Sequence, residues 1–260
     1  MRITRTIGVL MLAATAAAAA AQTPAPKADS AAKPEAKWEF TLAPYALMPT
    51  MQGHTALGYL PPVNVDADAS TIFSHLQGGA MLYFQMRKGD WAFATDAIYM
   101  NLGQPVHQDT GWASGDLGMK QWAWEGFLFY QFIPKFEIGV GFLGNKVNGT
   151  VSATLTPGAG DTTVSRGLTK SWWLPTIAMR WTPLDGAHWH GVLFADYGGT
   201  GGSNLSWQVM PSVGYRFSHT FELALQYRWI GIDYATGSGS DYFEYDMKIF
   251  GPQVGLSFTF

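Results

Sequence analysis

Large aromatic residues recur in this sequence as pairs separated by eight positions. The pairs are Trp91 and Tyr99, Trp122 and Tyr130, Trp173 and Trp181, Trp207 and Tyr215, and Phe221 and Trp229. Because eight is even, both members of a pair lie on the same face of a β-strand. Eight residues of a strand tilted by about 40° climb about 20 Å, close to the ~25 Å apolar band between the aromatic girdles of a membrane barrel. The spacing therefore predicts strands that cross a membrane.

The residues between these aromatic pairs divide into two alternating rows. The row that contains the aromatics carries no charge, as in Phe93, Thr95 and Ala97. The opposite row carries Arg87, Asp96, Glu125, Glu137, Arg180, Arg216, Glu222 and Arg228. An apolar outer face and a polar inner face are what surrounding lipid requires. We expect the eight charged residues to form ion pairs that fill a narrow barrel, whereas a polar path for small solutes is the alternative.

The composition supports this interpretation. Charged residues make up 13% of the chain and aromatics 15%, whereas soluble proteins average about 25% charged residues. The net charge of −3 and the lack of cysteine point neither to nucleic acid nor to a disulfide or thiolate metal site. No apolar run after Leu12 approaches the ~20 residues of a membrane helix.

The N-terminal residues have the features of an export signal. Arg2 and Arg5 precede an apolar run that begins at Ile7 and continues mostly in alanine to Ala21. We therefore expect a signal peptide over residues 1–21. The Pro-, Ala- and Lys-rich residues 22–37 predict a flexible periplasmic linker, and residues 38–260 the barrel.

The alternation predicts an all-β, antiparallel, up-and-down barrel of about ten strands, with eight as the alternative if the weak segment 190–197 and a neighbour fail. The expected strands are 38–50, 76–87, 91–102, 119–131, 136–147, 171–181, 190–197, 205–217, 221–234 and 242–260. Short turns near 88–90, 133–135, 182–189 and 218–220 are expected on the periplasmic side, and long loops at 51–70, 103–118, 148–170, 198–204 and 235–241 outside the cell. A short helix capped by Asp68 or Ser70 is expected inside the first loop.

Four prolines fall within the expected strands, namely Pro44, Pro175, Pro211 and Pro252. Because proline removes a hydrogen-bond donor from the ladder, we expect a β-bulge at each of them.

The sequence carries no recognisable catalytic or metal-binding motif. His188 and His190 alternate on one expected strand face with only Asp185 nearby as a third ligand, which favours a hydrated turn. His75 with Ser74, and His107 with Asp109, are adjacent pairs that do not form a triad. We expect no enzyme activity, no cofactor and no metal.

The last residues alternate strictly and end on an aromatic residue. Phe250, Pro252, Val254, Leu256, Phe258 and Phe260 form one row. This pattern resembles the C-terminal strand of bacterial outer-membrane β-barrels. Together with the hairpin over residues 79–91 and the Gly214–Phe217 segment, it is similar to small barrels of the OmpA/OmpW-like group. The resemblance implies that Phe260 ends the strand that closes the barrel and that the barrel-assembly machinery recognises this strand.

The expected protein is therefore an integral outer-membrane protein of a Gram-negative bacterium, with both termini in the periplasm. Its partners would be outer-membrane lipids and lipopolysaccharide, with no nucleic acid and an unknown loop ligand. We expect it to act through its extracellular loops or structurally. The alternatives are a passive pore for small polar solutes and a lipid-modifying enzyme.

Overall fold

The computed structural model describes residues 36–59, 61–107, 113–155, 162–202 and 204–260. The predicted signal peptide and most of the predicted linker, residues 22–35, lie outside the described residues. Among the described residues, no helix has the length and apolar character needed to cross a bilayer.

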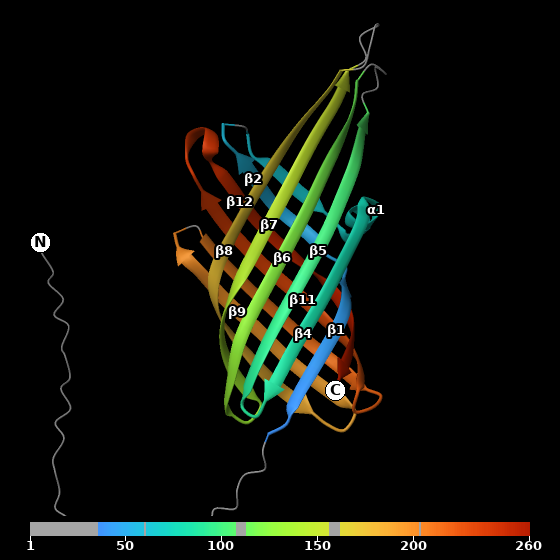
Figure 1. Ribbon diagram of the computed structural model, residues 1–260, viewed down its shortest axis with the longest axis vertical. Helices are drawn as coiled ribbons and strands as arrows, with labels where there is room; N and C mark the ends of the chain where they lie inside the picture. Colours follow the sequence, from blue (N-terminus) through green and yellow to red (C-terminus); the bar gives the residue numbers. More distant parts are fainter. Residues whose placement is uncertain (1–35, 60, 108–112, 156–161, 203) are drawn as a thin grey trace, which may run out of the picture. The chain divides into compact units, whose positions relative to one another are not determined.

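Ten antiparallel strands form a closed barrel (Figure 1), as the alternation predicts. They are β1 (Trp38–Leu47), β4 (Leu76–Lys88), β5 (Trp91–His107), β6 (Ala113–Ile133), β7 (Phe136–Leu155), β8 (Thr162–Asp185), β9 (Trp189–Gly201), β10 (Asn204–Arg216), β11 (Phe221–Thr236) and β12 (Phe243–Thr259). Each strand pairs with the next, and β1 pairs with β12 to close the ring. Phe260 continues this last pairing, since its backbone N–H and C=O exchange hydrogen bonds of 2.9 and 2.8 Å with Phe40.

The tight turns between β4 and β5, β6 and β7, and β10 and β11 lie at one end of the barrel, which we call the lower end. At the opposite, upper end, the segment expected as a loop over 51–70 instead contains two strands and the start of a helix. β2 (Thr50–Leu57) continues beside the upper half of β12, and β3 (Val63–Ala67) folds back on β2. Both strands are short, with 8 and 5 residues, and they lie among turn-forming residues. Their period-two pattern was therefore too brief to distinguish them from a loop.

Helix α1 (Ala69–Ser74) confirms the expected short helix. Asp68 caps it, accepting a hydrogen bond of 2.7 Å from the Thr71 backbone N–H and one of 2.9 Å from the Ser70 hydroxyl. The bond from Thr71 is the main reason why the pKa of the exposed Asp68 carboxyl lies below its ordinary value. A capped N-terminus satisfies backbone donors that would otherwise have no partner, which fixes where the helix begins.

Four strands extend far past the expected membrane band, so the prediction of loops over 103–118 and 148–170 is largely wrong. β5, β6, β7 and β8 are 17, 21, 20 and 24 residues long. At ~3.3 Å per residue and a tilt of about 40°, 24 residues climb roughly 60 Å, more than twice the ~25 Å apolar band. The upper parts of β5 to β8 form a sheet that projects from the barrel (Figure 1). Because water borders both faces of such a sheet, its sequence needs no apolar row and resembles a loop in composition.

The expected bulges at the four prolines are also wrong. The register runs without a shift through Pro175, Pro211 and Pro252, and the described shifts lie elsewhere, as between Trp181 and Leu184. Two of the prolines instead mark places where a strand changes partner. Pro44 is the last residue of β1 opposite β4, and Pro252 lies where β12 passes from β1 to β2. A residue without an N–H is tolerated where one ladder stops.

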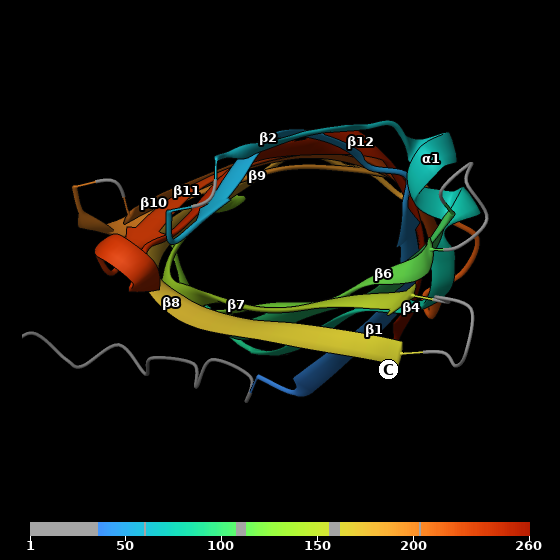
Figure 2. The same ribbon diagram turned by 90° about the horizontal axis from the view of Figure 1, so that it is seen from above.

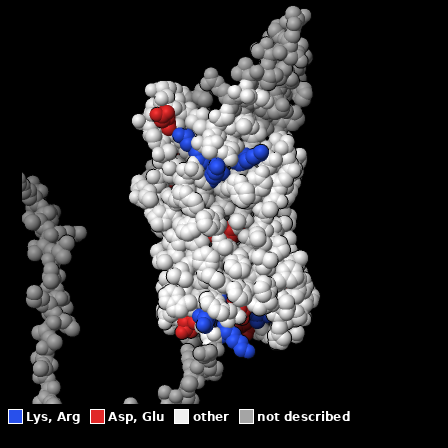
Figure 3. Space-filling model, in the orientation of Figure 1, with Lys and Arg blue, Asp and Glu red and all other residues white. Residues whose placement is uncertain are grey.

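The outer surface is apolar around the barrel. Of the ten girdle aromatics, Trp91, Trp122, Tyr130, Trp173, Trp181, Trp207 and Trp229 are exposed, and Tyr99, Tyr215 and Phe221 are half-buried. Trp91 packs against Tyr130 and Tyr99 against Trp122 in tilted ring pairs, with centroids 4.8 and 4.6 Å apart. On the face in Figure 3, charged side chains gather at the upper and lower margins, and almost none show between them. Lipid is the solvent that such a belt fits.

Candidate functional site

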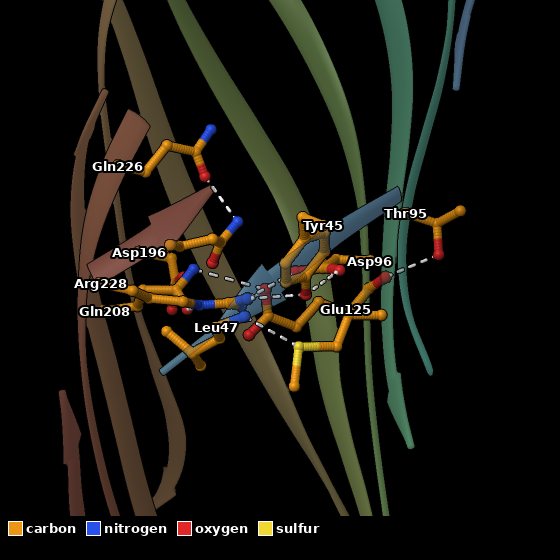
Figure 4. Close-up of polar contacts among 11 residues, drawn as sticks. Tyr45, Leu47, Thr95, Asp96, Glu125, Asp196, Gln208, Gln226 and Arg228 are labelled. Carbon is orange, nitrogen blue, oxygen red and sulfur yellow. Dashed lines mark hydrogen bonds and ion pairs between the residues drawn. The ribbon is translucent and has the colours of Figure 1, made fainter. Parts of the chain in front are cut away.

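The centre of the lumen is occupied by a charged cluster around Arg228 (Figure 4), whose side chain is almost fully buried. The guanidinium donates to Asp96 on β5 at 2.7 Å and to Glu125 on β6 at 3.2 Å. It also donates to Gln208 on β10 at 2.6 Å and to the Tyr45 oxygen on β1 at 3.2 Å. These contacts join strands from opposite sides of the barrel, so the Arg228 cluster spans the lumen.

Three further hydrogen bonds complete the Arg228 cluster. The Tyr45 hydroxyl donates to Asp96 at 2.7 Å. The Gln208 amide donates to Asp196 on β9 at 3.2 Å and to Glu125 at 3.4 Å. Three carboxyl groups thus share one guanidinium and one amide. A buried charge network of this kind is rigid, because removal of any member leaves another polar group without its partner.

Two more ion-pair groups lie below the Arg228 cluster. In one, Arg87 and Arg180 both donate to Glu137, and Arg180 also donates to Gln85 at 2.6 Å. Arg180 lies 4.5 Å from the ring centroid of Phe129, which adds a cation–π contact. In the other, Arg216 donates to Glu222 at 3.2 Å and to Asp185 at 2.9 Å.

All eight charged residues assigned to the inner row therefore lie in the lumen and form ion pairs in three groups. The sequence interpretation omitted Tyr45, Asp196 and Gln208. Each of them occupies the inner row of its strand, so the alternation contained the signal for their orientation. Gln208 lies near Arg228 across the β10–β11 hairpin. The meeting of Tyr45 and Asp196 with this group was not visible, because nothing local in the sequence relates β1 and β9 to β11.

A cavity of about 700 Å³ occupies the lower half of the lumen. Its lining includes the three ion-pair groups together with polar residues such as Thr41, Gln226 and Ser257. Lys135 and His219, which lie in the lower turns, also line it, so the cavity extends to the lower end of the barrel. One side of its wall is an apolar patch centred on Phe127, Phe129 and Phe194.

The upper half of the lumen is packed mainly with apolar side chains, together with the buried amides of Gln121 and Asn145. Leu143, Trp172 and Leu174 from β7 and β8 pack against Ile230, Ile232, Phe243, Tyr245 and Met247 from β11 and β12. Trp172 stacks on Tyr234 across the lumen with ring centroids 4.7 Å apart. We call these residues the upper plug. The lower cavity is thus separated from the upper end first by the Arg228 cluster and then by the upper plug.

Within the described part of the chain, no three His, Asp or Glu side chains come close enough to hold a metal ion. His190 contacts Glu222 at 3.3 Å, while His188 stacks on Tyr215. The Ser74 hydroxyl lies 3.1 Å from His75 Nδ1, but both groups bond to the Thr71 carbonyl at the end of α1. Asp109, the expected neighbour of His107, lies outside the described residues.

Comparison with known proteins identifies the fold. No protein family and no curated protein sequence matches this chain. The structure of the outer membrane protease OmpT from Escherichia coli is similar, with a TM-score of 0.52 and 10% identity over 85% of this chain and 97% of that chain. The chain has the fold of an outer-membrane β-barrel. The toluene transporter TbuX from Ralstonia pickettii matches with a TM-score of 0.36 and 11% identity, over 87% of this chain and 90% of that chain.

Proposed function

We propose that this protein is an integral outer-membrane barrel of a Gram-negative envelope that conducts no solute and acts at the cell surface. The observation that carries the proposal is the closed lumen. The Arg228 cluster joins opposite walls at mid-height, and the upper plug packs the same walls together above it. A solute entering the lower cavity would have to break a buried charge network and then cross an apolar core.

The apolar belt supports membrane insertion, and the turn lengths support the orientation. Short turns face the periplasm in bacterial barrels, so the lower end would be periplasmic, together with both ends of the 38–260 segment. Lipids and lipopolysaccharide would surround the belt. β12, which closes the ring on β1, is the strand that we expect the barrel-assembly machinery to recognise.

The surface available for an activity outside the cell is the projecting sheet of β5 to β8 with the β2–β3 hairpin and α1. Paired strands hold this sheet in one conformation, unlike the loops expected there. A rigid surface favours binding, because little entropy is lost when a partner docks on it. We propose no catalytic chemistry, and OmpT's protease activity stays a property of OmpT.

A passive pore is the second candidate, favoured by the cavity of about 700 Å³ in the lower half. Single-channel recording in planar bilayers tests it. We expect no conductance steps from the wild-type protein. Steps that disappear when Ala224→Trp fills the cavity but persist when Ala97→Trp adds the same ring to the outer face would overturn the proposal, since Ala224 lines the cavity and Ala97 belongs to the outer row.

Membrane insertion has its own test, which compares two exposed valines. Val140 on β7 and Val63 on β3 each expose 61% of their surface, but only Val140 lies in the apolar belt. Val140→Arg should destabilise the barrel in lipid vesicles by about 2–4 kcal/mol, as expected for arginine near the bilayer midplane. Val63→Arg should cost at most about 0.5 kcal/mol. Equal, small costs at both sites would show that lipid does not surround the belt.

A further inference from the structure

The barrel wall has a seam in its upper half, between β3 and β4. The β1–β4 ladder ends at Pro44 and Leu82, and above it β2 follows β12 instead of β4. The next contact of β1 with β4 is from the Leu47 N–H to the Met81 sulfur, at 3.3 Å, in place of a backbone bond. Helix α1, which joins β3 to β4, lies at this corner of the barrel (Figure 2).

A pocket of about 290 Å³ lies between α1 and the sheet of β5 to β7. Ala67, Ile72 and His75 line it on the α1 side, and Leu102, Met119 and Gly149 on the sheet side. On the sheet side, Gly149 leaves open space where a side chain would begin, since a Cβ there would meet no atom within 4 Å. The pocket is separate from the lower cavity, since the two have no lining residue in common.

The height of the pocket places it just outside the apolar belt. Leu102 is three residues beyond Tyr99, and Met119 three residues before Trp122, both in the upper girdle. Three residues of a tilted strand correspond to about 8 Å. The pocket therefore faces the outer surface of the membrane and not its hydrocarbon interior.

The lining determines what would bind. Most of it is carbon, and His75 is the one ionisable side chain among the lining residues. Its Nδ1 donates to the Thr71 carbonyl at 2.8 Å, since a carbonyl oxygen only accepts. Water gains few hydrogen bonds in such a site. An enclosed apolar cavity of ~150 Å³ holds benzene; this pocket has a volume of about 290 Å³ and is open on one side.

We propose that the pocket beneath α1 binds an uncharged apolar molecule from outside the cell, with the size of a substituted benzene ring. This binding site goes beyond the proposed surface role and does not depend on whether the lumen conducts. The apolar lining excludes charged ligands, because burial of an unpaired charge is costly.

Photolabelling tests the site with 3-(trifluoromethyl)-3-phenyldiazirine, a small apolar aromatic probe, on the full-length protein in lipid nanodiscs. Mass spectrometry should find saturable labelling of the peptides that contain Ile72 and Met119, and excess butylbenzene should reduce it at least tenfold. Labelling of the lipid-facing belt should not saturate, which separates the pocket from simple partitioning into lipid. Competition by a long-chain phospholipid alone would mean that a lipid chain fills the pocket and would overturn the proposal.

Two glycine variants serve as a test of the pocket and its matched control. A Cβ at Gly149 would meet no atom within 4 Å, so Gly149→Leu should fill the pocket without strain and reduce the saturable labelling at least tenfold. Gly167, on the neighbouring strand β8, lies outside the pocket lining, and its Cβ would meet only ordinary contacts of 3.8 and 3.9 Å. Gly167→Leu should label like the wild type.

Heat-modified mobility on gels verifies that each variant has folded. If Gly149→Leu does not fold, Ala67→Leu fills the pocket from the α1 side and replaces it. Saturable labelling that persists in a folded filling variant, or labelling of Ile72 and Met119 that never saturates, overturns the proposal.

Discussion

The two halves of the lumen have the same wall but different contents. Below Arg228, the inner rows carry charged and polar residues around a cavity of about 700 Å³. Above it, the inner rows of the same strands are mainly apolar and pack together, with the buried amides of Gln121 and Asn145 among them. On β11 the change occurs within two positions, from Gln226 and Arg228 to Ile230 and Ile232.

The difference shows that the polarity of the outer row and that of the inner row of a strand are determined by different neighbours. The outer row stays apolar throughout the belt because lipid surrounds it at every height. The inner row faces the opposite wall, and seen from above that wall lies closer across one axis of the barrel than across the other (Figure 2). Inner side chains from the two walls meet in both halves: as polar contacts at Arg228 and Asp96, and as apolar packing above them at Trp172 and Tyr234.

The largest effect should come from the boundary between the halves. Arg228→Ala leaves Asp96 and Glu125 buried without their cation, a loss that typically costs about 3–5 kcal/mol. Urea unfolding in lipid vesicles, followed by tryptophan fluorescence, would measure it. Arg228→Lys keeps the positive charge but loses the planar set of guanidinium donors. Its free energy of unfolding should lie between those of the wild type and of Arg228→Ala. A loss below about 1 kcal/mol for the alanine variant would mean that the Arg228 cluster does not hold the walls together.

The upper plug should respond to cavity formation. Leu174 is 1% exposed within it, and Leu174→Ala should destabilise the barrel by about 3 kcal/mol in the same unfolding experiment. Leu225, which is 56% exposed on the outer face, is the control. Leu225→Ala leaves no cavity and should cost less than about 1 kcal/mol. Similar costs at both positions would mean that the upper plug is not packed as a core.

The lower ion pairs should be more tolerant than the Arg228 cluster. Arg87→Ala removes one partner of Glu137, but Arg180 still pairs with this carboxylate. The expected cost is about 1.5 kcal/mol, that of one hydrogen bond to a charged group. Arg180→Ala should then destabilise the Arg87→Ala variant more than it destabilises the wild type, because in that variant Glu137 loses its last cation. Simple additivity in this double-mutant cycle would contradict the shared pairing.

Single cysteines offer the mildest perturbation, since the chain has none of its own. Ser257→Cys lies in the lower cavity and should react with a water-soluble maleimide added to the lower end. Ile232→Cys lies in the upper plug and should stay unlabelled in the folded barrel but react after unfolding in urea. Rapid labelling of both would show a continuous aqueous lumen, which would remove the distinction between the halves.

Much of the fold was predictable because lipid imposes a local rule. The pairs from Trp91 and Tyr99 onward mark strands whose outer row must be apolar, and this period of two is visible within each strand. The same rule oriented Arg87, Asp96 and the other charged residues inward. It failed for residues 103–118 and 148–170, where strands continue in water and no such rule applies, and for β2 and β3, which are too short to show a period.

The sequence by itself determined the barrel architecture, the apolar belt and which charged residues point into the lumen, since each of these depends on the alternation along one strand. It favoured ten strands but left eight open. Only the tertiary structure decided that Arg228 meets Tyr45 and two carboxylates across the lumen, that the upper half is plugged, and that α1 covers a seam with a pocket behind it. Contacts across a barrel follow from the stagger and curvature of all ten strands together. No single strand carries that information.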